Sequence, residues 1–276
     1  MRPVKLLLLL IVWPLLFVAA ALVRLWILVW RPQRRWRIVS RMTQSFVTLI
    51  RMIVNVRITV QGDLDLLDIE GAFIASNHLG YLDGFVLGSM FPILFVSKKE
   101  VRGWPVIGAW TALCGTVYID RERKGKIPLV VEEIVERINQ KANILIFPEG
   151  TSTNGDHLRP FQTAPFAAAL RAHAPVLPLT LTYRRINGEP VSEANRDDIY
   201  WYGDMDFMTH FWRVLSLRHI EVAVKFHPPI ETAHYKNISA GRKLLSQACY
   251  NAIASGLPQE RKPQRTPAFS ESNPNR

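Results

Sequence analysis

His78 and Asp83 are five residues apart in the stretch ASNHLGYLDGFVLG, which covers residues 75–88. A histidine held by a carboxylate has a defined tautomer and a stabilised protonated form, so it can take a proton from a hydroxyl group near neutral pH. The pair is therefore a candidate general base. Taken alone, it has a second interpretation: a buried histidine whose hydrogen bonds are satisfied within the core.

The general-base interpretation depends on the elements around the pair. The apolar run 71–76 predicts a buried strand before His78, and the apolar run after Asp83 predicts a helix. On one continuous helix the two side chains would be about 140° apart, because the helical period is 3.6 residues. His78 must therefore lie in a turn ahead of the helix, where Asp83 in the first helical turn reaches one imidazole nitrogen.

Two further segments place polar residues at the end of a predicted strand. The sequence ILIFPEGTSTNG continues a buried strand into a loop with Glu149 and Thr151, in which Gly150 lets a ligand approach the backbone closely. The sequence CGTVYIDR ends in Arg121, whose guanidinium could clamp a phosphate through two parallel hydrogen bonds. Taken alone, the first segment is better interpreted as an ordinary turn with an exposed glutamate, and Arg121 as a surface charge.

The rest of the chain alternates predicted strands and helices, which favours an α/β fold with a mixed, largely parallel sheet flanked by helices. Apolar, β-rich runs predict strands at 72–75, 93–96, 116–119, 144–147, 176–182 and 220–226. Helices are predicted at 83–90, 128–140, 161–172 and 240–255. A polar and aromatic insertion separates the last two strands, at 184–218.

This pattern divides the 276 residues into three parts. We expect an N-terminal membrane anchor at 1–57, a catalytic domain at 58–256 and a disordered tail at 257–276, since the tail is rich in Pro, Ser, Asn and charged residues. The two cysteines, Cys114 and Cys249, are far apart and lack metal-ligand spacing. We therefore expect two buried thiols and no metal site.

The N-terminal part is long and apolar enough for a membrane helix. Residues 6–23 are uncharged and apolar and residues 25–30 continue the run, whereas crossing a bilayer takes about 20 residues. Because the apolar run continues past its small residues, a cleaved signal peptide is the weaker interpretation. A second, amphipathic helix is predicted from Ile38, and it lies either in the membrane interface or against the domain.

The formal net charge of +11 arises almost entirely in this anchor. No acidic residue precedes Asp63, but ten of the 34 basic residues do, so 24 basic residues face 23 acidic ones in the remainder. Positive charge beside an apolar segment indicates anionic lipid head groups as partners rather than nucleic acid. Because most of this charge follows the first helix, we expect the catalytic domain on the cytoplasmic side of the inner membrane.

Together, these segments resemble the glycerolipid acyltransferase family, which includes 1-acylglycerol-3-phosphate acyltransferases. NHLGYLD resembles its N-H-x4-D block, GTVYIDR the second block, FPEGT the third and VLPL (176–179) the fourth, in the same order. The resemblance implies that His78 is the base and Asp83 its partner. It also implies that the acceptor is bound by Asn77, Arg121, Glu149, Gly150 and Thr151.

The reaction that the resemblance implies is transfer of a fatty acyl group from acyl-carrier protein or acyl-CoA to the free hydroxyl of a lysophospholipid. The commonest acceptor in the family is 1-acyl-sn-glycerol 3-phosphate, which gives phosphatidic acid, and no cofactor is implied. One departure is Ser152, since the third block often continues with Arg. The FPEGTST-x-G form and the segment WYGDM (201–205) resemble a branch that includes lyso-ornithine lipid acyltransferases, so lyso-ornithine lipid or another lysolipid is an alternative acceptor.

Two other functions are alternatives to acyl transfer. In a thioesterase, water would replace the acceptor at His78. A non-catalytic membrane scaffold would keep the fold without the reaction, and the presence of both His78 and Asp83 argues against it.

Overall fold

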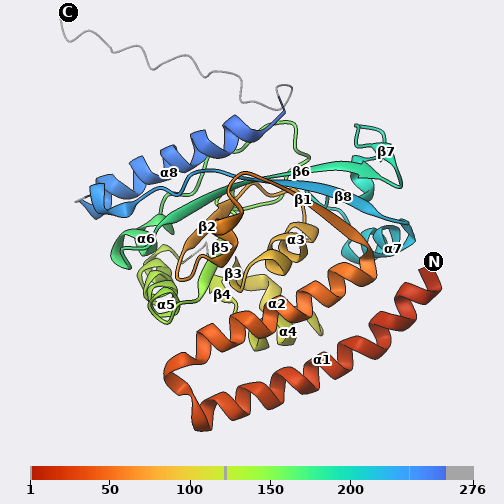
Figure 1. The fold of residues 1–276 in the computed structure, drawn as a ribbon, viewed down its shortest axis with the longest axis horizontal. Helices are drawn as coiled ribbons and strands as arrows, with labels where there is room; N and C mark the ends of the chain where they lie inside the picture. Colours follow the sequence, from red (N-terminus) through yellow and green to blue (C-terminus); the bar gives the residue numbers. More distant parts are fainter. Residues whose placement is uncertain (1, 121–122, 236, 259–276) are drawn as a thin grey trace, which may run out of the picture.

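The computed structural model describes residues 2–120, 123–235 and 237–258, built around one eight-stranded sheet (Figure 1). The strands are β1 (Val56–Gln61), β2 (Phe73–Ser76), β3 (Ile93–Lys98), β4 (Val117–Ile119), β5 (Asn143–Ile146), β6 (Val176–Ile186), β7 (Glu189–Pro190) and β8 (Ile220–Phe226). Their order is β1-β8-β6-β2-β5-β3-β4, with β7 paired to β6. Only the pairings of β6 with β8 and with β7 are antiparallel among the described strands. The predicted mixed, largely parallel sheet is confirmed.

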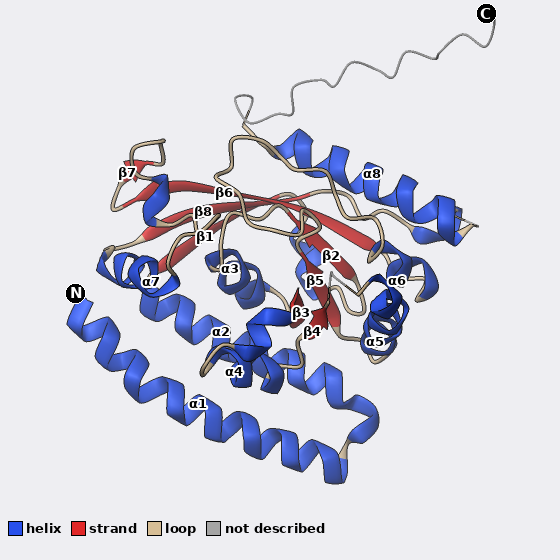
Figure 2. Cartoon of the chain, turned by 180° about the vertical axis from the view of Figure 1, so that it is seen from behind, coloured by secondary structure: helices blue, strands red, loops and turns tan. Residues whose placement is uncertain are grey.

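Helices cover both faces of this sheet (Figures 1 and 2). Those assigned within the described residues are α1 (Arg2–Trp30), α2 (Arg35–Val54), α3 (Leu82–Met90), α4 (Ile107–Leu113), α5 (Ile127–Asn139), α6 (Phe166–Arg171), α7 (Phe207–Ser216) and α8 (Ile238–Gly256). One hydrophobic core joins the sheet to α3, α4 and α7, and the other joins it to α5, α6 and α8. The sheet is therefore the middle layer of three.

Strand β2 shows why the central strands are continuously apolar. Phe73 and Ala75 pack in the core with α5, α6 and α8, whereas Ile74 packs in the core with α3 and α4. All of β2 is buried. A parallel strand that is covered on both faces needs apolar residues at every position, which is the pattern of 72–75.

The parallel pairing of β2 with β5 brings two of the sequence motifs together. The register pairs Phe73 with Ile144 and Ala75 with Ile146. Because the two strands run in the same direction, the turn that begins with Asn77 and the loop that begins with Phe147 leave the sheet at the same edge. Local sequence patterns predicted each segment, and the sheet order makes them neighbours.

The first two helices form an antiparallel pair along one side of the domain (Figures 1 and 2). Helix α2 packs against α3, and the Gln44 amide donates a 3.1 Å hydrogen bond to the Met90 carbonyl at the end of α3. Of the two predicted positions for the amphipathic helix, the structure therefore shows the one against the domain. At the other end of the pair, the Lys5 ammonium of α1 donates hydrogen bonds to the carbonyls of Val54 and Leu217, at 2.7 and 2.8 Å.

Several elements differ from the sequence expectations. The helix predicted at 161–172 begins only at Phe166, because the Gln162 N–H donates a 2.7 Å hydrogen bond to the Pro148 carbonyl and holds this segment over the FPEGT loop. The predicted insertion contains α7, which is capped by Asp206 through a 2.8 Å hydrogen bond from the Thr209 N–H. Strand β1 and helix α4 were not predicted. Of the predicted tail, residues 259–276 lie outside the described residues.

Candidate active site

His78 lies in the turn between β2 and α3, and Asp83 lies in the first turn of α3. The imidazole Nδ1 is 2.8 Å from Oδ2 of Asp83. An ionised carboxylate only accepts hydrogen bonds, so Nδ1 carries the proton and Nε2 presents a lone pair. The predicted geometry, with His78 ahead of the helix and Asp83 reaching back, is present.

The Asp83 carboxylate is fully buried and has four hydrogen-bond donors. Besides His78, Oδ2 accepts from the N–H groups of Leu79 and Gly80, at 2.6 and 2.9 Å. Oδ1 accepts a 2.9 Å hydrogen bond from the hydroxyl of Tyr183 in β6. Every partner donates, so both oxygens of the buried carboxylate have hydrogen-bond donors. Asp83 therefore holds both the turn and the imidazole in one position.

The His78 ring is also held by stacking. It lies parallel to the Phe147 ring, with centroids 4.0 Å apart and an interplanar angle of 10°. About a fifth of its side chain is exposed, at 21%. A base that is held in place but partly accessible is suited to proton transfer with a bound substrate.

Glu149 connects the FPEGT loop to the catalytic turn. Its Oε1 accepts a 2.8 Å hydrogen bond from the His78 N–H, and its Oε2 accepts a 3.0 Å hydrogen bond from the Arg159 N–H. Burial raises the pKa of this carboxyl from its usual 4.5 to about 7, although the two N–H donors act in the opposite direction. A second hydrogen bond links the FPEGT loop to the turn: the Thr153 N–H donates to the His78 carbonyl at 3.0 Å. Hydrogen bonds therefore join the loop and the turn into one unit.

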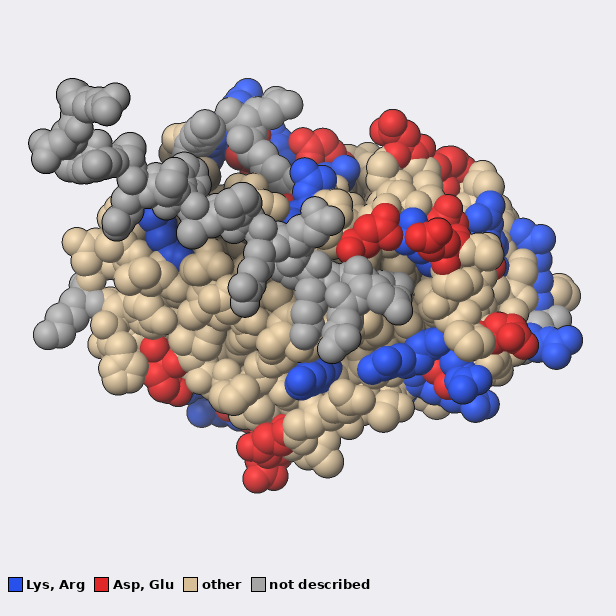
Figure 3. Space-filling view, turned by 90° about the horizontal axis from the view of Figure 1, so that it is seen from above, with Lys and Arg blue, Asp and Glu red and all other residues tan. Residues whose placement is uncertain are grey.

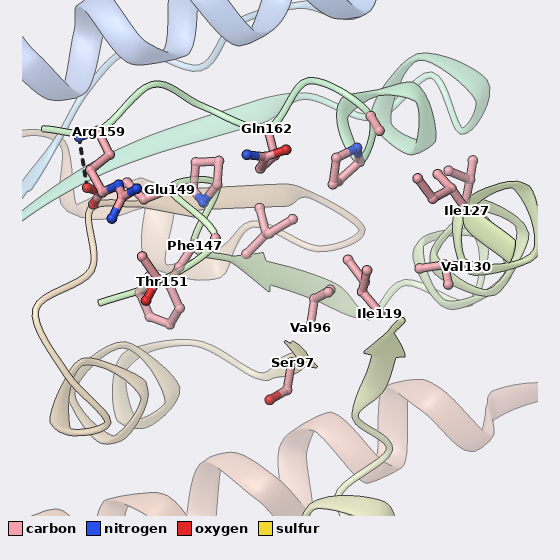
Figure 4. A pocket seen from close by; sticks show the side chains of 16 residues that line it. Val96, Ser97, Ile119, Ile127, Val130, Phe147, Glu149, Thr151, Arg159 and Gln162 are labelled. Atoms are coloured by element: carbon pink, nitrogen blue, oxygen red, sulfur yellow. Dashed lines mark hydrogen bonds between the residues drawn. The ribbon is translucent and has the colours of Figure 1, made fainter. Parts of the chain in front are cut away.

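Next to this unit is a cavity of about 470 Å³ (Figure 4). Its apolar side is formed by residues from β3, β4 and α5, among them Val96, Ile119 and Val130. Its polar end contains Glu149 and Arg159, and Phe147 lies beside them (Figure 4). A cavity of this size with apolar walls and a few polar groups is typical of a small-molecule or lipid site.

Three of the five predicted acceptor-binding residues line this cavity: Glu149, Gly150 and Thr151. Gly150 has a φ of 78°, a left-handed conformation that glycine adopts without strain, so the loop can turn directly after Glu149. The fourth, Asn77, is buried, and its side-chain amide exchanges hydrogen bonds of 3.0 and 2.8 Å with the backbone of Leu181 in β6. The fifth, Arg121, lies outside the described residues. Substrate binding by these five residues stays a prediction.

The structure adds three residues that sequence reasoning missed. Tyr183 reaches Asp83 from β6, Phe147 supports the imidazole, and Arg159 lines the cavity. Nothing local marks Tyr183 in the sequence, because its partner is 100 positions away. Arg159 had a signal: it is a basic residue shortly after a loop motif that lacks one.

The insertion between β6 and β8 packs on both halves of the site. The Trp201 N–H donates a 2.9 Å hydrogen bond to the Leu79 carbonyl in the catalytic turn. Arg196 forms an ion pair with Asp156 in the FPEGT loop. The segment WYGDM therefore packs on the catalytic turn through Trp201.

No group of three or more His, Cys, Asp or Glu side chains comes together as a metal site within residues 2–120, 123–235 and 237–258. Cys114 and Cys249 are both buried free thiols, as expected.

Comparison with known proteins agrees with this geometry. A family model described as Acyltransferase matches residues 57–182. The lyso-ornithine lipid O-acyltransferase of Brucella abortus is 30% identical over 226 residues, which cover 79% of this chain and 82% of that protein. The chain belongs to the acyltransferase family. The predicted family resemblance is confirmed. The prediction of an enzyme of lipid metabolism, rather than a non-catalytic scaffold, is confirmed as well.

Two further proteins are similar to this acyltransferase, one in sequence and one in structure. The 1-acyl-sn-glycerol-3-phosphate acyltransferase of Neisseria gonorrhoeae is 31% identical over 157 residues, 57% of this chain and 59% of that protein. The crystal structure of the 1-acyl-sn-glycerophosphate acyltransferase PlsC from Thermotoga maritima superposes with a TM-score of 0.59 at 16% identity, covering 92% of this chain and 97% of that one. That likeness shows a shared fold.

Proposed function

We propose that this acyltransferase moves a fatty acyl group from acyl-carrier protein or acyl-CoA to the free hydroxyl of a lysolipid. The observation that carries the proposal is the 2.8 Å contact between Nδ1 of His78 and the buried Asp83 carboxylate, which leaves Nε2 as the base. The apolar wall of the adjacent cavity suits an acyl chain and its polar end suits a head group. The names of the acyltransferases that it resembles support the substrate class.

In the proposed reaction, Nε2 of His78 takes the proton of the acceptor hydroxyl while the oxygen attacks the thioester carbonyl. The new ester C–O bond forms, the C–S bond breaks, and the thiolate leaves with the proton from the imidazolium. Asp83 stabilises the transient positive charge on the ring. No covalent enzyme intermediate is needed, because the acceptor oxygen is itself the nucleophile.

Two acceptors fit this chemistry. The first is 1-acyl-sn-glycerol 3-phosphate, which would give phosphatidic acid. The second is lyso-ornithine lipid, which is favoured by the names of the relatives from Brucella abortus and Rhodobacter capsulatus and by Ser152 in place of a basic residue after FPEGT.

We further propose that the enzyme lies on the inner membrane with α1 in one leaflet and the catalytic domain on the cytoplasmic side. By length and composition, α1 is the one helix of the described residues that could cross a membrane. Along its length, however, α1 contacts the domain, through Lys5 near one end and Ile27 near the other. The face around α8, far from α1, carries Asp and Glu as well as Lys and Arg (Figure 3), which suits a surface in water.

The test is His78→Ala in the purified full-length protein, with lysolipid acceptors offered beside acyl-CoA and acyl-carrier-protein donors and products read by mass spectrometry. We expect transfer to fall by a factor of about 100 or more, since a general base contributes about 10²–10⁴-fold, while binding to lipid vesicles is unchanged. His234→Ala, an exposed histidine outside the site, is the control. Near wild-type transfer in His78→Ala would refute the assignment, and free fatty acid formed without regard to acceptor would indicate a thioesterase.

A further inference from the structure

Arg159 lines the cavity but has no role in the proposed proton transfer. Among the described residues that line the cavity, it is the one basic side chain, and Glu149 is the one acidic side chain. Both lie at the polar end, away from the apolar wall of Ile127 and Val130 (Figure 4). Among the described residues, an anion that enters this cavity therefore meets one cation, Arg159.

The position of Arg159 is set by the backbone. Its N–H donates to Oε2 of Glu149 at 3.0 Å, while Oε1 accepts the N–H of His78 at 2.8 Å. Two hydrogen bonds on one carboxylate keep these two backbone nitrogens within about 8 Å of each other. The FPEGT loop thus returns to its own start and places Arg159 near the candidate base.

The guanidinium of Arg159 is available to a ligand. Arg159 is exposed, and its side chain makes no hydrogen bond or ion pair with the described part of the chain. Its neighbour in the same region, Arg196, differs because it is paired with Asp156. A free guanidinium at the mouth of a cavity offers two parallel N–H donors to a phosphate or carboxylate.

We propose that Arg159 binds the anionic group of the acceptor and so orients its free hydroxyl toward His78. This inference deepens the proposed function and rests on it. A phosphate on glycerol and the carboxylate of an ornithine head group share the required chemistry. Each has two oxygens that can accept parallel hydrogen bonds from one guanidinium. Because residues 150–158 contain no Lys or Arg, Arg159 supplies the positive charge of this loop from its far end.

The experiment compares Arg159→Gln with wild type in binding and in turnover. Binding is measured by calorimetry in detergent micelles without an acyl donor, for three probes: 1-acylglycerol 3-phosphate, N-(3-hydroxyacyl)ornithine and the neutral 1-acylglycerol. We expect Arg159→Gln to weaken binding of one or both acceptors that carry an anionic group, the phosphate or the ornithine carboxylate, about tenfold or more, because a charge-assisted hydrogen bond is lost. Binding of 1-acylglycerol should not change. The lipid with the larger loss identifies the head group. In turnover, the acceptor KM rises and the donor KM does not.

Two variants separate charge from structure. Arg159→Lys keeps the charge but not the paired donors, and should bind with intermediate affinity. Arg184→Gln removes an exposed arginine of β6 that does not line the cavity, and should behave as wild type. Unchanged binding of both the phosphate-bearing and the carboxylate-bearing acceptor in Arg159→Gln, or an equal loss for 1-acylglycerol, would overturn the proposal. If wild type transfers no acyl group, the proposed function fails while the binding comparison still decides the role of Arg159.

Discussion

The Tyr183 hydroxyl donates a 2.9 Å hydrogen bond to Oδ1 of Asp83, and the two residues are 100 positions apart in the sequence. Both side chains are buried. Oδ2 of the same carboxylate is shared by His78 and two backbone N–H groups, so Tyr183 is the described partner that holds Oδ1. The orientation of the candidate base thus depends on a strand in the middle of the sheet.

Tyr183→Phe should lower kcat about tenfold and leave both substrate KM values unchanged. The ring still fills its space, but one oxygen of a buried carboxylate loses its donor, which costs about 1–3 kcal/mol. Steady-state kinetics over a range of pH will measure the effect. Tyr250→Phe is a matched control, because it removes a hydroxyl bonded to the Leu158 carbonyl and not to Asp83. Equal kinetics in the two variants would contradict a positioning role for Tyr183.

Gly80→Ala should disrupt the site, whereas Gly84→Ala should not. A Cβ on Gly80 would be 2.8 Å from the backbone N of Trp201, so the catalytic turn and the insertion would have to separate, at a cost of about 1–3 kcal/mol. A Cβ on Gly84 would meet Phe95 Cε1 at 3.5 Å, an ordinary contact, and alanine favours the helix. Activity and Tm will be measured for both variants. Wild-type activity in Gly80→Ala would show that the insertion does not support the turn.

Glu149→Gln should change how stability depends on pH. Since burial raises the pKa of Glu149 from 4.5 to about 7, the folded protein holds this proton more tightly than the unfolded chain. The contribution of this group to the free energy of unfolding is therefore fully present below pH 4.5. It is lost as pH rises through about 7, and this lowers the free energy of unfolding by roughly 3 kcal/mol. The glutamine has no such dependence.

The measurement is thermal unfolding of wild type and Glu149→Gln between pH 5 and pH 8. In the variant, one of the two backbone N–H groups loses its acceptor, which lowers the free energy of unfolding by about 1–3 kcal/mol at every pH. The variant should therefore be less stable than wild type at pH 5. As pH rises, the difference in Tm should shrink. A difference that is constant or grows with pH would mean that Glu149 is ionised throughout.

The two ends of α1 should lie on the same side of the membrane. The helix has 29 residues and is about 43 Å long, enough to cross a bilayer, but it packs along the domain. Arg2→Cys and Arg31→Cys place single thiols at its two exposed ends, while Cys114 and Cys249 are buried. A membrane-impermeant thiol reagent should label both new cysteines in inside-out vesicles and neither in right-side-out vesicles. Labelling of one position in each preparation would show that α1 spans the bilayer.

The sequence by itself determined the local parts of this site. His78 and Asp83 meet within one turn, so strand, turn and helix patterns over a dozen residues were enough to predict their contact. The alternation of apolar runs likewise predicted a mixed, largely parallel sheet, because strands that are buried on both faces need apolar residues throughout.

Only the tertiary structure decided which distant residues join that turn. The strand order places β5 and β6 on either side of β2, and this brings Glu149 and Tyr183 to His78 and Asp83. Docking of the insertion and the return of the FPEGT loop then bring Trp201 and Arg159 beside them. Local periodicity reports which face of an element is buried, but it carries no information about which element will cover that face. The neighbours of the site were therefore fixed by strand pairing and helix packing across the whole chain.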